Sequence, residues 1–440
     1  MKLTPTPIEI EEFEGFTPEK DIFQRKQYAE QLTNIVSNVN DELVVAIDAP
    51  WGEGKSTFVR MWRGLLKQNS IESIYFDAYK NDFIEDPFLA LIGEIYSLLN
   101  SNENTKVKKE FKEQAISAIK TIGKAGVRIG IRAATAGVLD ETVLEGAGAG
   151  DELAAISDKY ISERLESLEE DKASIEAFKS VLAKAANELG GENKLIFVID
   201  ELDRCKPSFA LEILEKIKHI FSIPGIVFIL VMNREQMNEI IKSRYGIGID
   251  STKYLQKFVH IWTGLPKSNE QHTSDIKKYL NDCLARMDFE LKTRSQQSGI
   301  ELYVELLSHY NASLREIERS LTHFAIIHNM TDSNINADYM WLSIYLSITK
   351  VLFPSSYKKL ANGNTTYEEI LTETKLSSLE DEYWGKGKAE PHPIRWLIRY
   401  YLSDDEQVKE LLAQGNHSES RGFGRTAIKD ICGWIETFNR

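Results

Sequence analysis

Two kinds of segment alternate along the first 266 residues. Short runs of β-branched and aromatic residues, such as LVVAID and KLIFVID, have the length and composition of buried strands. Between them, apolar residues recur at helical spacing. We expect strands at Leu43–Asp48, Ile71–Phe76, Lys194–Asp200 and Gly225–Met232, and helices at Asp21–Val39, Ser56–Lys67, Phe88–Leu99 and Ser208–Phe221. This alternation predicts an α/β fold with a parallel sheet covered by helices.

The pattern changes at two places. Residues 100–190 are rich in Lys and Glu, then in Gly and Ala through Gly146–Gly150, and then strongly helical, which predicts a helical insertion whose centre is either a hinge or a loop. Beyond Pro266 the chain is almost entirely helical, including Ser274–Met287, Ile300–His309 and Ser313–His328. We expect an arm at 1–20, a core at 21–266 with the insertion at 100–190, a lid-like helical subdomain at 267–330 and a C-terminal helical domain at 331–440.

Composition removes several classes of protein. A chain of 440 residues with 42% hydrophobic and 27% charged residues is ordinary for a globular protein of two or three domains. The net charge of −14 argues against sequence-independent nucleic-acid binding, which depends on neutralising phosphates. Ile122–Leu139 is rich in small apolar residues, but Lys124, Arg128 and Arg132 interrupt it, so we expect no transmembrane segment.

The three cysteines lie far apart, with no spacing typical of a disulfide framework or a zinc site. They therefore favour a reducing, cytoplasmic location. Cys205 is expected to pack as a small apolar residue rather than to act as a nucleophile.

The segment APWGEGKST follows the first strand and opens a helix, and it fits a phosphate-binding loop with Ala at the first glycine position. Gly52 and Gly54 would let backbone amides surround phosphate oxygens, while Lys55 supplies a positive charge and Ser56 a hydroxyl for Mg²⁺. The alternative is a plain glycine turn. The expected nucleotide-binding residues are Ala49, Pro50, Trp51, Gly52, Glu53, Gly54, Lys55, Ser56 and Thr57. The chain is therefore predicted to have a P-loop NTPase core.

Two carboxylates end the strand in LIFVIDELDR. Asp200 is expected to hold Mg²⁺ together with Ser56, and Glu201 to polarise the water that attacks the γ-phosphate, acting with Lys55 as a catalytic residue. The same carboxylates would also suit a solvated helix cap.

Asn233 ends the next strand, where it could contact the γ-phosphate or, alternatively, cap the helix that follows. Arg204 and Arg315 are the preferred candidates for an arginine sensor or finger, with Arg234, Arg244 and Arg319 as further possibilities. ATP is favoured over GTP because the chain lacks a guanine-reading NKxD element.

These motifs occur in a particular order: DIFQRKQYAEQL, APWGEGKST, YFDAYKNDFIEDPFLALIGEI, DELDRC, YLQKFVHIWTGLP and SLREIERSL. In this order and spacing they resemble the KAP family of P-loop NTPases, over about Asp21 to Leu321. Asp77-Ala-Tyr79 stands where the family commonly has Asn-Ala-Trp, and Glu201 stands where many members have Asp. The part after about Thr331 is not covered by the resemblance.

The resemblance carries further expectations. Family members often have membrane hairpins between the phosphate loop and the acidic strand, whereas the charged insertion of this chain suggests a soluble version. Bacterial members are commonly associated with defence against phage, often beside a separately encoded effector protein. The resemblance thus implies an ATP hydrolase acting as a motor or switch within a homo-oligomer or a complex.

Two alternatives remain open. The chain could be a nucleotide-gated scaffold with weak hydrolysis that recruits an effector through C-terminal aromatic residues, although these would equally suit a hydrophobic core. The residues in question are Trp384, Trp396, Tyr400, Tyr401 and Trp434. Peripheral membrane attachment through Gly123–Leu139 is the other alternative.

Overall fold

A computed structural model of the chain describes residues 1–39, 41–100, 105–135, 150–191, 193–266, 272–331, 336–379, 392–414 and 426–437. The centre of the insertion, including nearly all of Gly146–Gly150, lies outside these residues. So does Trp384.

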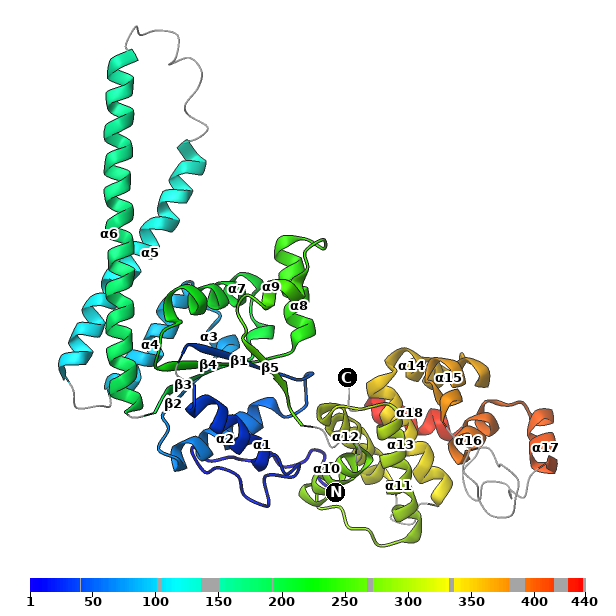
Figure 1. The fold of residues 1–440 in the computed structure, drawn as a ribbon. Coiled ribbons are helices and arrows are strands. Elements are labelled where there is room, and N and C mark those ends of the chain that lie inside the picture. Colours follow the sequence, from blue (N-terminus) through cyan, green and yellow to red (C-terminus); the bar gives the residue numbers. More distant parts are fainter. Residues whose placement is uncertain are drawn as a thin grey trace.

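Five parallel strands form one sheet in the order β2-β3-β4-β1-β5 (Figure 1). The bounds are Leu43–Asp48 for β1, Ser73–Asp77 for β2, Leu195–Asp200 for β3, Ile226–Met232 for β4 and Ile261–Gly264 for β5. The predicted α/β fold with a parallel sheet is confirmed, and four strands lie where the apolar runs indicated. The fifth strand, β5, was not anticipated.

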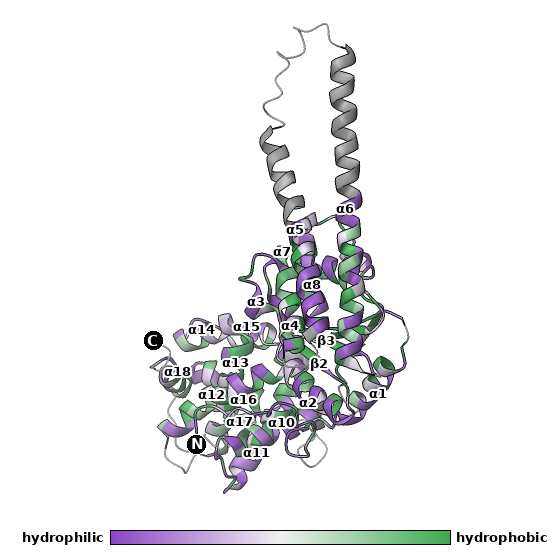
Figure 2. Cartoon of the chain, turned by 90° about the vertical axis from the view of Figure 1, so that its left-hand side faces the viewer, coloured by the Kyte–Doolittle hydropathy of each residue, from purple (hydrophilic) through white to green (hydrophobic). Residues whose placement is uncertain are grey.

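Helices cover both faces of the sheet, which explains why the strands are apolar on both sides. Successive residues of β1 separate accordingly, since Val44 and Ala46 join one hydrophobic cluster while Val45 and Ile47 join the other. Figure 2 shows hydrophobic residues gathered on the strands and on the helix sides that meet them. One face packs against α1 (Lys26–Ser37) and α2 (Lys55–Gln68), and the other against α4 (Pro87–Asn100), α7 (Pro207–Lys216) and α8 (Arg234–Tyr245), with the short α3 (Ala78–Asn81) and α9 (Ser251–Leu255) at loops.

The insertion contributes two long helices, α5 (Thr105–Thr135) and α6 (Gly150–Gly190), which run side by side in Figure 1. Their ends nearest the sheet belong to the core. Phe111 of α5 and Phe178 of α6 are fully buried, with ring centroids 5.8 Å apart, and Phe178 also contacts Phe88 of α4. The insertion is therefore anchored to the sheet by aromatic packing.

The remaining helices form a separate helical body. One hydrophobic cluster includes described residues from Ile276 to Ile435, so the segments on either side of residue 330 share one core. Its helices are α10 (His272–Arg286), α11 (Arg294–His309), α12 (Leu314–Met330), α13 (Ala337–Leu352), α14 (Pro354–Asn362), α15 (Tyr367–Glu373), α16 (Pro393–Leu402), α17 (Asp405–Gln414) and α18 (Ala427–Thr437). The division into subdomains at 267–330 and 331–440 stays a prediction.

The C-terminal aromatics lie in that core. Trp396, Tyr400 and Tyr401 are each 8% exposed, and Trp434 packs against the cluster. The hydrophobic-core interpretation therefore holds for these four residues, and they offer no exposed docking face.

The N-terminal arm is tied to both bodies. The Lys2 backbone amide donates to the Met287 carbonyl of the helical body (2.7 Å), and the Arg286 guanidinium donates to the Thr6 carbonyl (2.6 Å). Further along, Gly15 lies against Gly64 of α2 so closely that a Cβ on Gly64 would come within 2.1 Å of the Gly15 nitrogen. The arm thus runs from the helical body to the sheet domain.

Candidate functional site

The carboxyl ends of the parallel strands position the residues of the site. In the register of the parallel strands, Asp77 pairs with Asp200, and Asp200 with Val231, while Asp48 pairs with Met232 and Gly264. The carboxyl ends of all five strands therefore meet along one edge, where ligands bind in open α/β sheets. Because β4 lies between β1 and β3, one strand separates Asp200 from the loop that follows β1.

The phosphate-binding loop connects β1 to α2, as the sequence predicted. Gly52 and Gly54 have φ angles of 85° and 78°, which side chains with a Cβ rarely adopt. A Cβ on Gly52 would also lie 2.8 Å from the Cβ of Arg315, at the start of α12. Glycine at this position is therefore required both by the turn and by the helical body packed against it.

Lys55 is the first residue of α2, and its ammonium group lies within the loop. Its Nζ donates to the carbonyls of Ala49 and Pro50, the latter at 3.1 Å. Burial lowers the pKa of Lys55, while the nearby carboxylates of Asp203 and Asp200 oppose that shift. The lysine charge is thus held between the loop and the acidic strand end.

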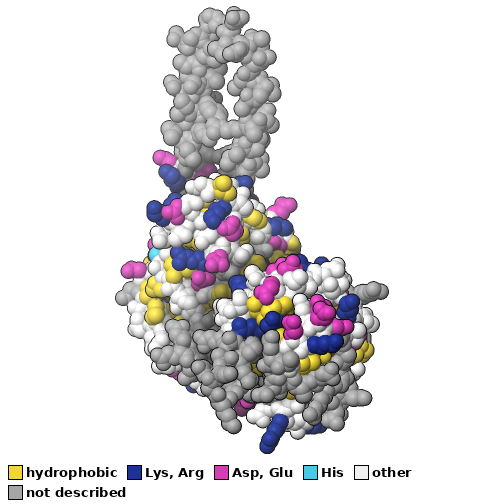
Figure 3. All heavy atoms as spheres, turned by 90° about the vertical axis from the view of Figure 1, so that its right-hand side faces the viewer, with side chains coloured by type: hydrophobic (Ala, Val, Ile, Leu, Met, Phe, Trp, Pro, Cys, Tyr) yellow, Lys and Arg dark blue, Asp and Glu magenta, His cyan; other side chains and the backbone are white. Residues whose placement is uncertain are grey.

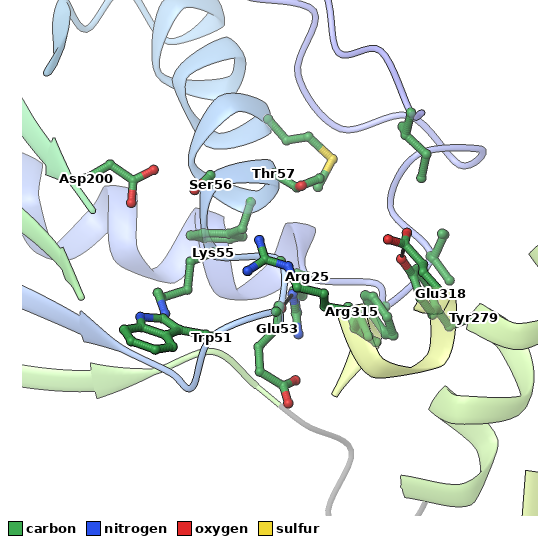
Figure 4. Close-up of a pocket in the computed structure, with 18 of the residues that line it drawn as sticks. Arg25, Trp51, Glu53, Lys55, Ser56, Thr57, Asp200, Tyr279, Arg315 and Glu318 are labelled. Atoms are coloured by element: carbon green, nitrogen blue, oxygen red, sulfur yellow. Dashed lines mark hydrogen bonds between the residues drawn. The ribbon is translucent and has the colours of Figure 1, made fainter. Parts of the chain in front are cut away.

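Asp200 is fully buried and well supplied with donors. Its carboxylate accepts hydrogen bonds from the Tyr75 hydroxyl (2.9 Å) and from the Glu201 amide (2.8 Å), and it also bonds to Ser56. Burial raises the pKa of Asp200, and these hydrogen bonds oppose that shift. Figure 4 shows the Asp200 carboxylate on the side where Ser56 lies. The Asp200 carboxylate and the Ser56 hydroxyl are adjacent oxygen ligands of the kind that Mg²⁺ prefers.

Glu201 follows β3 in a strained conformation. Its φ of 58° is left-handed, which is uncommon for a residue other than glycine, and such strain often marks functional sites. Its carboxylate pairs with the Arg204 guanidinium at 2.9 Å. Burial raises the pKa of Glu201, whereas Arg204 lowers it.

The acidic segment is also bonded directly to the loop, which the sequence did not reveal. The Trp51 indole donates to the Asp203 carboxylate, and Asp203 is only 5% exposed. A tryptophan inside the loop and a buried aspartate three residues beyond β3 therefore hold the two motifs together.

Asn233 performs the capping role that was its alternative interpretation. Its side-chain oxygen accepts from the amides of Glu235 and Gln236 at the start of α8. It is 8% exposed and does not line the cavity described below. Contact with a γ-phosphate stays a prediction.

One cavity of about 250 Å³ gathers these groups (Figure 4). It includes Trp51 through Thr57, Asp200, Glu201 and both preferred arginines, Arg204 and Arg315. Of the other arginines, Arg234 lies over the Trp262 ring (4.5 Å), and Arg319 lines a different cavity. The part of the wall that comes from residues 8–25 and from the helical body was not predicted. It consists of Ile8, Lys20, Asp21, Ile22, Phe23, Arg25, Tyr279, Leu314 and Glu318.

Arg25 is the least expected of these residues. It is 5% exposed, its Nη1 donates to the Glu53 carbonyl of the loop (3.1 Å), and its guanidinium lies over the Phe23 ring. Burial lowers the pKa of Arg25, while Glu53 and Asp21 oppose that shift. A buried cation thus stabilises the loop through its hydrogen bond to the Glu53 carbonyl.

Comparisons with known proteins were made on this chain. A family model described as the KAP family P-loop domain matches residues 25–331. Among solved structures, the Aeropyrum pernix ORC2 protein in its ADPNP–ADP complexes is similar at 12% identity and a TM-score of 0.36, covering 94% of each chain. The crystal structure of a DNA replication initiation factor is similar at 11% identity and a TM-score of 0.28, covering 97% of this chain and 96% of that one. Neither similarity is close enough to indicate a function.

No curated protein matches this chain. Within the part of the chain that the structure describes, no helix has both the length and the hydrophobicity needed to cross a bilayer.

Proposed function

Because the chain belongs to the KAP family of P-loop NTPases, we propose that it binds ATP at Ala49–Thr57 and hydrolyses it with Mg²⁺. The observation that carries this proposal is the convergence of Lys55, Ser56, Asp200 and Glu201 on one cavity. These are the lysine, hydroxyl and carboxylates that phosphoryl transfer to water requires.

We assign the binding roles to the loop. Backbone amides of Gly52 to Ser56 would surround the phosphates, and Lys55 would leave the loop carbonyls to meet the β- and γ-phosphates. Ser56 and Asp200 would hold Mg²⁺, whose charge offsets that of the phosphate oxygens.

We assign the proton-accepting role to Glu201. Its carboxylate must release Arg204 before it can take a proton from water, and the freed guanidinium could then face the developing charge on the phosphate. Arg315, which lies against Gly52 from the helical body, is the second candidate for that role.

Phosphate release with Mg²⁺-ATP tests the assignment. We expect Glu201→Gln to keep nucleotide binding but to lower turnover about 100-fold or more, as for loss of a general base. Lys55→Ala should instead weaken binding itself. Equal turnover in wild type and Glu201→Gln would remove Glu201 from its proposed role.

The ion pair between Glu201 and Arg204 favours a second candidate, a nucleotide-gated scaffold with slow hydrolysis. Pairing with arginine makes a carboxylate a weaker base, so turnover would stay slow until a partner separates the pair. Truncation after Thr331 is a poor test because it would cut the continuous core. Partner capture by wild type, Glu201→Gln and Lys55→Ala with ATP is a better one. Loss of a partner with Lys55→Ala but not with Glu201→Gln supports the scaffold, and equal capture by all three contradicts it.

We further propose a cytoplasmic role in anti-phage defence, within a homo-oligomer or beside a separate effector. The support is the family membership, since the site itself names no partner. Plating efficiency of phage on cells that carry the wild-type locus or Lys55→Ala tests this role. Equal plating would contradict it, and light scattering with Mg²⁺-ATP would report the oligomeric state.

A further inference from the structure

A second cavity, of about 540 Å³, opens on the surface of the helical body. Arg319 and His323 of α12, Lys350 of α13, Tyr357 and Lys358 of α14, and Glu436 of α18 contribute to its wall. None of these residues lines the cavity around the phosphate-binding loop. Its volume is within the range typical of small-molecule sites.

The charge of this wall is opposite to that of the chain. It holds three cationic side chains, Arg319, Lys350 and Lys358, and one carboxylate, Glu436, whereas the whole chain has a net charge of −14. Lys350 pairs with Glu436 at 2.5 Å. The side chains of Arg319 and Lys358 make no hydrogen bond or ion pair with any residue that the structure describes. Two positive charges are thus left to face the cavity. Figure 3 shows acidic and basic side chains mixed on the coloured surface of the helical body, so this local excess is not part of a broad basic face.

His323 adds a polar group that also lacks a partner. Its Nδ1 is buried and, among the described residues, makes no hydrogen bond. Burial and the nearby Lys350 charge lower the pKa of His323 to about 4, so the ring is neutral at physiological pH. A neutral imidazole can donate or accept one hydrogen bond to a ligand.

The rest of the wall is apolar or aromatic. Val351 and Pro354 line it, and the buried Tyr357 ring lies behind the Lys350 ammonium, which is 4.7 Å from the ring centroid. The Tyr357 hydroxyl donates to the Cys432 carbonyl, which fixes the ring. Such a wall suits the organic part of a ligand, while the cations suit an anionic group.

We propose that this cavity binds a small phosphorylated molecule of about the size of a nucleoside monophosphate. Arg319 and Lys358 hold its phosphate, His323 makes a hydrogen bond to it, and the organic part packs against Val351 and Pro354. The site is separate from the ATP site, although α12 connects the two. Arg315 on that helix lies against Gly52 of the loop, and Arg319, one turn later, reaches the second cavity.

Calorimetric titration of the full-length protein with AMP, inorganic phosphate and adenosine tests the proposal. The titration is made in a Lys55→Ala background, so that binding at the loop is weakened and the two sites are distinguished. We expect AMP and phosphate to bind and adenosine not to bind. Arg319→Glu and Lys358→Glu, tested singly, should each weaken AMP binding at least ten-fold. Lys409→Glu, an exposed lysine of α17 outside the cavity, is the matched control and should bind as the parent does.

AMP binding that survives both charge reversals would overturn the site, as would no AMP binding in the parent. Binding of adenosine with the affinity of AMP would overturn recognition of the phosphate. Thermal unfolding of each variant checks that it folds, and the two independent reversals keep the test decisive if one of them does not. Failure of this site would leave the proposed hydrolysis at Lys55 and Glu201 unaffected.

Discussion

At the scale of single residues, the environment of Asp200 explains how a fully buried carboxylate is kept ready for a metal ion. Burial favours the protonated form, and the Tyr75 hydroxyl, the Ser56 hydroxyl and a backbone amide oppose it. Tyr75 would therefore be a positioning residue that acts, through Asp200, on the Mg²⁺ that we propose there. It lies on the edge strand β2, and its hydroxyl donates to Asp200 at the end of the neighbouring strand β3.

Tyr75→Phe removes only that hydroxyl. The pKa of Asp200 should rise further and its carboxylate should lose one orienting contact, so the apparent affinity for Mg²⁺ should fall about ten-fold. Mg²⁺ titration of ATP turnover measures this effect. Tyr79→Phe, on an exposed tyrosine of α3, is the control, and an identical Mg²⁺ dependence in both variants would contradict the role given to Tyr75.

Arg204→Gln tests the ion pair with Glu201 through pH. Burial raises the pKa of Glu201 above its ordinary value of 4.5, and Arg204 lowers it. Without the arginine, the pKa rises further. Because the base must be deprotonated, the acid limb of the kcat/KM profile should move to higher pH. A limb that stays in place would show that the pair does not control the base.

Much of the residue-scale site followed from the sequence because its groups belong to short motifs. The loop motif named Lys55 and Ser56, and the apolar strand ending in two acids named Asp200 and Glu201. Arg25 and the contact of Trp51 with Asp203 could not be predicted, since both depend on contacts between segments distant in sequence. Their only signal was their place within motifs that resemble the family.

At the scale of elements, long apolar runs were predictable and short ones were not. β1, β3 and β4 are six or seven residues long and buried except for Asp48, whereas β5 has four residues that are exposed or partly buried. β5 forms because it pairs with β1, from Val45 to Asp48, rather than from any strong pattern of its own. α7 likewise continues as a π-helical turn, Ile217–Phe221, where the apolar spacing indicated one uninterrupted helix.

Substitutions at two helix glycines distinguish the effect of packing on stability from the effect of helix propensity. Gly64→Ala of α2 should destabilise the fold by about 1–3 kcal/mol, because its Cβ would overlap the backbone of Gly15 in the arm. Gly93→Ala of α4 has no heavy atom within 4 Å of the new Cβ. It should stabilise the fold by up to about 1 kcal/mol through helix propensity. Urea unfolding measures both, and equal effects at the two positions would mean that the arm does not lie against α2.

At the scale of the whole molecule, the proposed nucleotide site is built from three parts of the chain. The loop and the acidic strand end come from the sheet domain, Arg315 and Tyr279 from the helical body, and Ile8 and Lys20 from the arm. Closure of the helical body over nucleotide would therefore move Arg315 relative to Gly52. The sequence identified the parts but not their meeting, because the arm carries little periodic pattern and reaches its partners Met287 and Gly64 only after folding.

Equilibrium binding of Mg²⁺-ATP to the purified full-length protein is the most direct test of the central claim. The account predicts saturable binding that Lys55→Ala weakens at least ten-fold, and that Lys67→Ala, an exposed lysine at the far end of α2, leaves unchanged. Absence of binding in the wild type, or equal binding by all three proteins, would contradict it.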